Sequence, residues 1–179
     1  MSHKEQDQTV ASVGSDGNHR IYRHVLAGLV RAMDWFDNGL QNLLAARGFK
    51  TLHRTQSMIM LHIAGGIESP ADIAREMGLT RQNVHHMAKS LIADGLIEQA
   101  PDPRDPRRTM YRLSDSSRDI RGEALEILRD LELALAGRIG HESVAALKRV
   151  IGSEWGAEIR DDEELNQALG ASTRSAREG

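Results

Sequence analysis

Residues Ser69 to Leu113 define the architecture of this chain and read SPADIAREMGLTRQNVHHMAKSLIADGLIEQAPDPRDPRRTMYRL. The first four of them, Ser69 to Asp72, resemble a capping-box start with proline at the first helical position, so a short helix is expected from there to Gly78. A second helix is expected from Thr80, its N-cap, to Asp94, because Gly95 then favours a helix end.

Two extended stretches follow the second helix. Residues 96–100 and 109–113 each read as a strand, and the three prolines within residues 101–106 exclude a central strand between them. A β-hairpin with a long loop is therefore expected. The order helix, turn, helix, strand, basic tip, strand predicts a winged helix-turn-helix with residues 80–94 as its second helix.

The outward face of that second helix carries polar and basic side chains and no Asp or Glu. Val84, Met87 and Leu91 recur at helical spacing and are expected to face the core. Amide side chains can pair with adenine edges, whereas histidine, lysine and arginine suit guanine or phosphate. The candidate DNA contacts of this helix are Thr80, Arg81, Gln82, Asn83, His85, His86 and Lys89, of which Arg81 and Lys89 are expected mainly on phosphates.

The hairpin tip concentrates arginine. Arg104, Arg107 and Arg108 lie within five residues, and a narrow minor groove attracts arginine through its enhanced negative potential. Aspartates beside phosphates are costly unless they orient guanidinium groups, and Asp105 with Arg107 is the expected pair. Residues 80–112 hold six Lys/Arg and four Asp/Glu, a net charge of +2, although the whole chain carries −3.

Apolar residues at spacings of three and four predict long amphipathic helices on both sides of this segment. Their stripes need more surface than one small domain supplies, so two copies are expected to pair as a homodimer. The fold class is mainly α with a small β-hairpin wing. Helices are expected at about 20–47, 55–64, 114–139 and 142–155. The expected organisation is a disordered segment at 1–18, a single winged-helix domain at 19–170 (dimerisation by 19–48 and 115–170, DNA binding by 55–113) and a disordered tail at 171–179.

Composition excludes several classes of protein. The 179 residues include no cysteine, which rules out disulfides and thiol chemistry. The chain shows no membrane-length apolar run and no signal-peptide pattern, so a cytoplasmic protein without a membrane anchor is expected. No nucleotide-binding or nucleophile motif is present, so we expect no enzyme, no catalytic residues and no cofactor. The eight histidines include no pair three or four residues apart, and no metal site is expected.

Four stretches resemble the multiple-antibiotic-resistance regulator (MarR) family. They are QSMIM at 56–60, GLTRQNV at 78–84, LIADGLI at 91–97 and DPRDPR at 102–107 followed by Leu113-Ser114. The resemblance covers about residues 20–155. It implies a homodimeric transcription factor, usually a repressor, that binds a pseudo-palindromic operator. It also implies that Arg107 is the minor-groove arginine and Asp105 the acid that braces it.

The resemblance further implies an effector pocket between the dimerisation helices and the DNA-binding part, in a family that often accepts aromatic acids. A small aromatic or phenolic effector is the corresponding expectation. The candidate pocket residues are His24, Trp35, His53, Arg54 and His62, with Arg54 as a carboxylate anchor. Packing of Trp35 against a partner subunit is the alternative interpretation for that residue. The alternative for the whole protein is a winged helix that binds another protein, without sequence-specific DNA binding.

Overall fold

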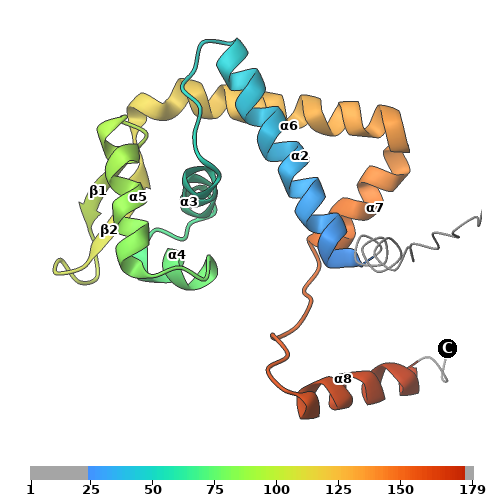
Figure 1. Ribbon diagram of the computed structural model, residues 1–179. Coiled ribbons are helices and arrows are strands. Elements are labelled where there is room, and N and C mark those ends of the chain that lie inside the picture. The colour runs from blue at the N-terminus through green and yellow to red at the C-terminus, as the bar shows by residue number, and fades with distance from the viewer. Residues whose placement is uncertain (1–23, 176–179) are drawn as a thin grey trace, which may run out of the picture. The chain divides into compact units, whose positions relative to one another are not determined.

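The helix-turn-helix and its hairpin form as the sequence indicates (Figure 1). The structure, a computed structural model, describes residues 24–175, with side chains described for residues 24–170. The expected disordered segment 1–18 and the last four residues lie outside the described residues. The elements are α2 Val25–Ala46, α3 Arg54–Ala64, α4 Pro70–Glu76, α5 Arg81–Ala93, β1 Ile97–Pro101, β2 Thr109–Leu113, the 3-10 turn η1 Asp115–Ser117, α6 Arg118–Ile139, α7 His141–Ile151 and α8 Asp162–Ser175. The predicted class, mainly helical with a small antiparallel hairpin, is confirmed.

The two helix starts in this segment are stabilised differently. Thr80 caps α5 as expected, because its hydroxyl accepts the backbone N–H of Asn83 at 3.2 Å. Ser69 occupies the N-cap position of α4, but its side chain makes no capping hydrogen bond, so the expected capping box is wrong. The fixed backbone angle of Pro70 and its burial start this helix instead.

A glycine makes the tight turn between α4 and α5 possible. Gly78 has φ +63°, a conformation that residues with a Cβ rarely adopt. The next residue, Leu79, donates its N–H to the Ala74 carbonyl at 2.8 Å, which closes the end of α4 and directs the chain into α5.

The core of the winged helix-turn-helix part joins three helices to the hairpin. Each of these elements contributes apolar side chains with almost no solvent exposure. Burial of each Val, Leu or Ile side chain among them contributes about 1.5–3 kcal/mol. The fully buried members are Ile59 of α3, Ile73 of α4, Val84, Ala88 and Leu91 of α5, Ile97 of β1 and Tyr111 of β2. The position of α5 is therefore fixed from three sides.

The hairpin pairs in a single register from Ile97 opposite Leu113 to Pro101 opposite Thr109. Its first strand ends one residue later than expected, at Pro101. A proline is tolerated there because the sheet has only two strands, so each is an edge strand. The hairpin is tied to the core by the N–H of Tyr111, which donates to the Glu68 carbonyl at 2.8 Å.

The chain divides into two compact units, one that ends at Ala134 and one that begins at Leu135. In the first unit, α2 packs on α6: Arg47 and Glu123 form a hydrogen-bonded ion pair at 2.6 Å, and a Cβ at Gly39 would lie 3.0 Å from Leu131 Cδ2. Residues 115–117 form a 3-10 turn, so the long helix begins at Arg118 rather than at Ser114.

The second unit differs from expectation at two places. The helix expected to reach Trp155 ends at Ile151, because the chain leaves the helix at Gly152 and the indole Nε1–H of Trp155 donates back to the Val150 carbonyl at 2.8 Å. Residues 171–175, expected in a disordered tail, continue the helix α8 that begins at Asp162. The acidic residues at 162–164 form its first turn, where the helix dipole favours them.

Candidate nucleic-acid interface

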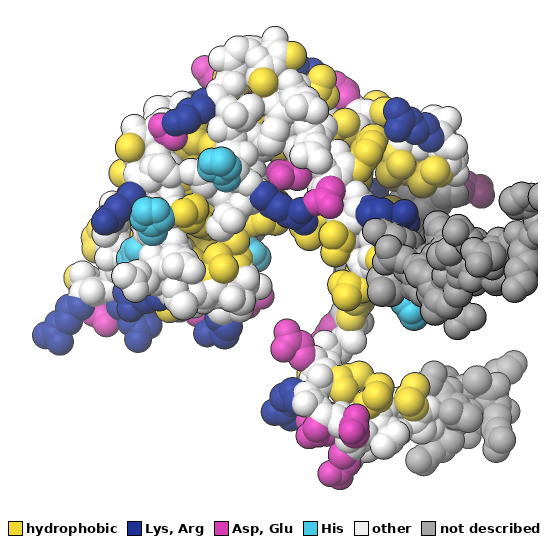
Figure 2. Space-filling view, in the orientation of Figure 1, with side chains coloured by type: hydrophobic (Ala, Val, Ile, Leu, Met, Phe, Trp, Pro, Cys, Tyr) yellow, Lys and Arg dark blue, Asp and Glu magenta, His cyan; other side chains and the backbone are white. Residues whose placement is uncertain are grey.

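One face of α5 is exposed over its whole length. Val84, Ala88 and Leu91 are buried, and the opposite side presents polar and basic groups. The orientation expected from the spacing is therefore confirmed. The exposed residues of α5 are Arg81, Gln82, Asn83, His86, Lys89, Ser90 and Ala93. Figure 2 shows dark blue Lys and Arg side chains gathered along the lower left of the molecule, over the wing and the helix-turn-helix.

His85 lies on the side of α5 that faces the wing. Its Nδ1 is 2.5 Å from the hydroxyl of Tyr111 on β2, and the two rings meet edge to face with centroids 5.9 Å apart. We expected His85 on the flank of the DNA-binding face; the structure shows it half-buried and bonded to the wing strand. This contact joins α5 to the wing directly.

Burial favours the neutral form of both members of this pair, and nearby cations further favour neutral His85. Burial lowers the pKa of His85 below 6.5, and the positive charges of Arg81 and Lys89 lower it further. Burial raises the pKa of Tyr111 above 10. Because both groups stay uncharged near neutral pH, a neutral hydrogen bond connects α5 to β2.

The aspartates of the wing tip bind mainly within the tip itself. Asp102 Oδ1 accepts the backbone N–H of Arg104 at 2.8 Å, and Asp105 Oδ1 accepts the backbone N–H of Arg107 at 3.1 Å. The carboxylate of Asp105 also lies 3.5 Å from Nε of Arg108. The expected bracing of the Arg107 side chain by Asp105 is therefore wrong. Asp105 holds the backbone at Arg107 and pairs with the Arg108 side chain.

This arrangement leaves cationic side chains exposed at the tip. Arg104 and Arg107 are exposed, and no ion pair of their guanidinium groups is found among the described residues. The tip can therefore present two guanidinium groups to an anionic partner while its aspartates stabilise the turn.

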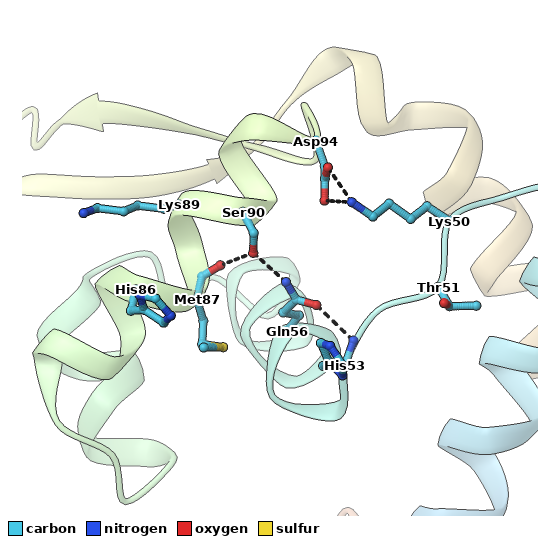
Figure 3. Close-up of a pocket in the computed structure, with 9 residues that line it drawn as sticks. All are labelled: Lys50, Thr51, His53, Gln56, His86, Met87, Lys89, Ser90 and Asp94. Carbon is cyan, nitrogen blue, oxygen red and sulfur yellow. Dashed lines mark hydrogen bonds and ion pairs between the residues drawn. The ribbon is translucent and has the colours of Figure 1, made fainter.

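On the other side of α5 lies a groove of about 470 Å³ (Figure 3). The segment before α3 forms one wall and the C-terminal half of α5 the other. The residues that line it are Lys50, Thr51, His53, Gln56, His86, Met87, Lys89, Ser90 and Asp94. Two of them, His86 and Lys89, also belong to the exposed face of α5, so the groove opens beside that face.

A buried glutamine holds this groove together. Gln56, only 8% exposed, donates to the Ser90 hydroxyl at 2.6 Å and accepts the backbone N–H of His53 at 2.9 Å. The sequence interpretation missed this role. Gln56 stands three and seven residues before the buried Ile59 and Ile63, and a polar residue on a core stripe is a signal that could have revealed it.

The candidate effector residues do not share a described pocket. Trp35 packs edge to face on Phe36 with ring centroids 4.9 Å apart. Arg54, the expected carboxylate anchor, forms an ion pair with Asp34. His53 lines the groove beside α5, whereas His24 precedes α2 and His62 lies near the end of α3. Their role in effector binding stays a prediction.

The described part of the chain contains neither a metal site nor a membrane span. Among residues 24–170, no group of three or more His, Asp or Glu side chains is placed to hold a metal ion. No described helix combines the length and apolar character needed to cross a membrane.

Comparison with known proteins points to one family. Residues 50–108 match the MarR family. The transcriptional regulator AdcR of Streptococcus pneumoniae is 29% identical over 72 residues, which are 40% of this chain and 49% of AdcR. The match therefore spans about half the length of that relative.

Two solved structures share the fold. The transcriptional regulator Tm0710 of Thermotoga maritima is 16% identical with a TM-score of 0.51, and the match covers 88% of this chain and 97% of Tm0710. The reduced form of MarR from E. coli is 19% identical with a TM-score of 0.55 and coverages of 70% and 93%. The winged helix-turn-helix predicted from the sequence is thereby confirmed.

Proposed function

Because the resemblance to the MarR family is confirmed over residues 50–108, we propose that this chain is a transcriptional regulator that binds double-stranded DNA and catalyses no reaction. One observation carries the proposal. The exposed face of α5 has no acidic side chain, and it lies beside a wing whose aspartates bind within the tip. If this surface contacted only solvent, nothing would favour keeping acidic side chains away from the basic ones.

The docking mode follows from the groove dimensions of DNA. A helix fits the major groove, so α5 enters there with Gln82, Asn83 and His86 toward base edges. Arg81 and Lys89 then lie toward phosphates. The wing reaches the flanking minor groove, where Arg107 inserts and Arg104 and Arg108 lie close to the backbone. The capping bond of Thr80 fixes the start of α5 for this docking.

The chain is proposed to act as a homodimer on a pseudo-palindromic operator. Exposed apolar side chains along α2 and α6, such as Leu26 at 73% and Leu125 at 70%, leave each helix with surface for a partner copy. Two copies would read half-sites about one helical turn apart. We further propose that the dimer represses transcription. A small aromatic or phenolic effector relieves this repression by changing the spacing of the two DNA-binding parts.

Electrophoretic shift or fluorescence anisotropy with promoter fragments next to its own gene tests the proposal. Specific binding should exceed binding to unrelated duplexes by at least about 10³-fold. A chain that binds no fragment even at low salt would instead be a winged helix that recognises another protein.

A further inference from the structure

The groove beside α5 is the strongest unassigned feature of the described residues. Two lysines (Lys50 and Lys89), two histidines (His53 and His86) and a single acid (Asp94) line it. Thr51 and Ser90 add hydroxyl groups, and Figure 3 shows that the lining comes from the segment before α3, from Gln56 of α3 and from α5. Such a lining suits an anionic oxygen group.

When α5 lies in the major groove of DNA, the position of the protein groove beside α5 identifies the anion as a phosphate of the DNA backbone. A helix in the major groove has one phosphate backbone on each side. On one side of α5 stands the wing, to which His85 is bonded through Tyr111. On the opposite side stands the segment of residues 50–53, and α5 lies between the hairpin and α3 (Figure 1).

We infer that the groove seats the DNA backbone strand on the side of α5 away from the wing, with Lys50, Thr51, His53 and Lys89 as phosphate contacts. This inference rests on the proposed function, because it needs α5 in the major groove. It assigns Lys50, Thr51 and His53 to DNA, and it takes His53 out of the effector pocket. The ligand is a phosphodiester, recognised through charge and hydroxyl groups and without base sequence.

Asp94 forms an ion pair with Lys50, the most important of the proposed phosphate contacts in this groove. Both carboxylate oxygens of Asp94 lie 2.7 Å from Lys50 Nζ. Asp94 follows the last residue of α5, where the helix dipole disfavours an acid, so Lys50 compensates for a charge that is unfavourable at that position. The Lys50 side chain is 66% exposed, and an ion pair so exposed is weak enough for a phosphate to compete for the ammonium group.

The buried Gln56 makes this seat rigid. Its two hydrogen bonds connect α5 at Ser90 to the backbone at His53, across the floor of the groove. The two walls are therefore held at a fixed separation, which lowers the entropic cost of binding a backbone strand between them.

The test measures how the affinity of the full chain for a labelled DNA duplex depends on salt concentration. The duplex is about 30 base pairs long and of mixed sequence, because phosphate contacts do not depend on base sequence. Lys89→Met and Lys50→Met should each reduce the slope of log K against log salt by about 0.9 per bound subunit. Asp94→Asn should bind about fivefold more tightly with a steeper slope, because Lys50 is released and a negative charge is removed. Lys148→Met on α7, the same substitution outside the groove, should leave the slope unchanged.

Three results would overturn the inference. Unchanged slopes for both lysine variants, with wild-type chain still bound, would remove the groove from the DNA interface without touching the proposed function. Weaker binding by Asp94→Asn with an unchanged melting temperature would show that Asp94 does not restrain a phosphate contact. A third result would be that sodium benzoate displaces DNA more effectively than sodium chloride at the same ionic strength, and that Lys50→Met abolishes this difference. The groove would then be a small-molecule site. Failure of the wild-type chain to bind any duplex would refute the proposed function itself.

Discussion

The winged helix-turn-helix part buries most of its apolar side chains in one core, whereas the long helices leave several of theirs exposed. In residues 54–113, Ile59, Ile73, Val84 and Leu91 have no exposed surface. On α6, by contrast, Leu125 is 70% exposed and Leu133 is 56% exposed. The first region completes its core within one chain. The second presents apolar helix faces that a single chain does not cover, which is the physical basis for proposing a homodimer.

The largest expected effect comes from breaking the self-contained core. Leu91→Ala should lower the free energy of unfolding by about 2–5 kcal/mol, because it leaves a cavity among side chains from four elements. Leu125→Ala, the control on the exposed helix face, should change the stability of the isolated monomer by less than about 0.5 kcal/mol. Urea denaturation at low protein concentration measures both. Equal losses would mean that the two regions do not differ as described.

The exposed faces of the long helices can be tested as a dimer interface by measuring the mass of the particle in solution. Leu133→Glu should shift the particle toward the mass of one 19.8 kDa chain, because a carboxylate in an apolar dimer interface is costly to bury. Leu61→Glu is the matched control, since Leu61 is 60% exposed on α3 in the DNA-binding part. Light scattering after size exclusion gives the masses. A wild-type monomer, or dissociation by both variants, would contradict the assignment of the interface to the long helices.

Within the DNA-binding part, the wing should contribute affinity without selectivity. Arg107→Ala should weaken binding about tenfold on all sequences and flatten the salt slope by about one unit. Anisotropy titrations at several salt concentrations measure both quantities. Arg129→Ala on α6 serves as the charge-matched control. A slope that stays at the wild-type value would count against insertion of Arg107 beside phosphates.

The exposed face of α5 should instead contribute selectivity. His86→Ala should reduce discrimination at one position of each half-site by about 1 kcal/mol and leave other positions unaffected. Competition with operator variants, each changed at one base pair, resolves the position. If all variants lose affinity equally, His86 contacts a phosphate in the neighbouring groove rather than a base.

The smallest effect concerns the contact that joins α5 to the wing. Since the pKa of His85 is lower in the folded chain than its ordinary 6.5, the unfolded chain binds more protons just below pH 6.5. Stability should therefore fall as pH drops through this range, and part of that fall should vanish in His85→Gln. Melting temperatures at about pH 5.5 and about pH 7.5 show the difference. An identical pH response in both chains would assign the acid sensitivity to other groups.

Several features of the interface could be read from local sequence. The cap at Thr80, the apolar spacing of Val84 and Leu91 and the extended residues 109–113 all depend on neighbours within a few positions. Such patterns are local, so the helices and the outward face of α5 could be predicted. The pairing of Asp105 with Arg108 instead of Arg107 could not, since it depends on the path of the backbone through the tip.

Local patterns predicted the winged helix-turn-helix, the orientation of α5 and the concentration of arginine at the wing tip, because periodicity, capping and turn residues act over short distances. Long-range packing instead set the contacts of His85 with Tyr111, of Arg54 with Asp34, and of Lys50 and Gln56 with α5 across a groove. The residues of these pairs stand 20 or more positions apart, and their contacts depend on how whole helices pack. Chain packing therefore determines which polar groups remain exposed on α5 and the wing.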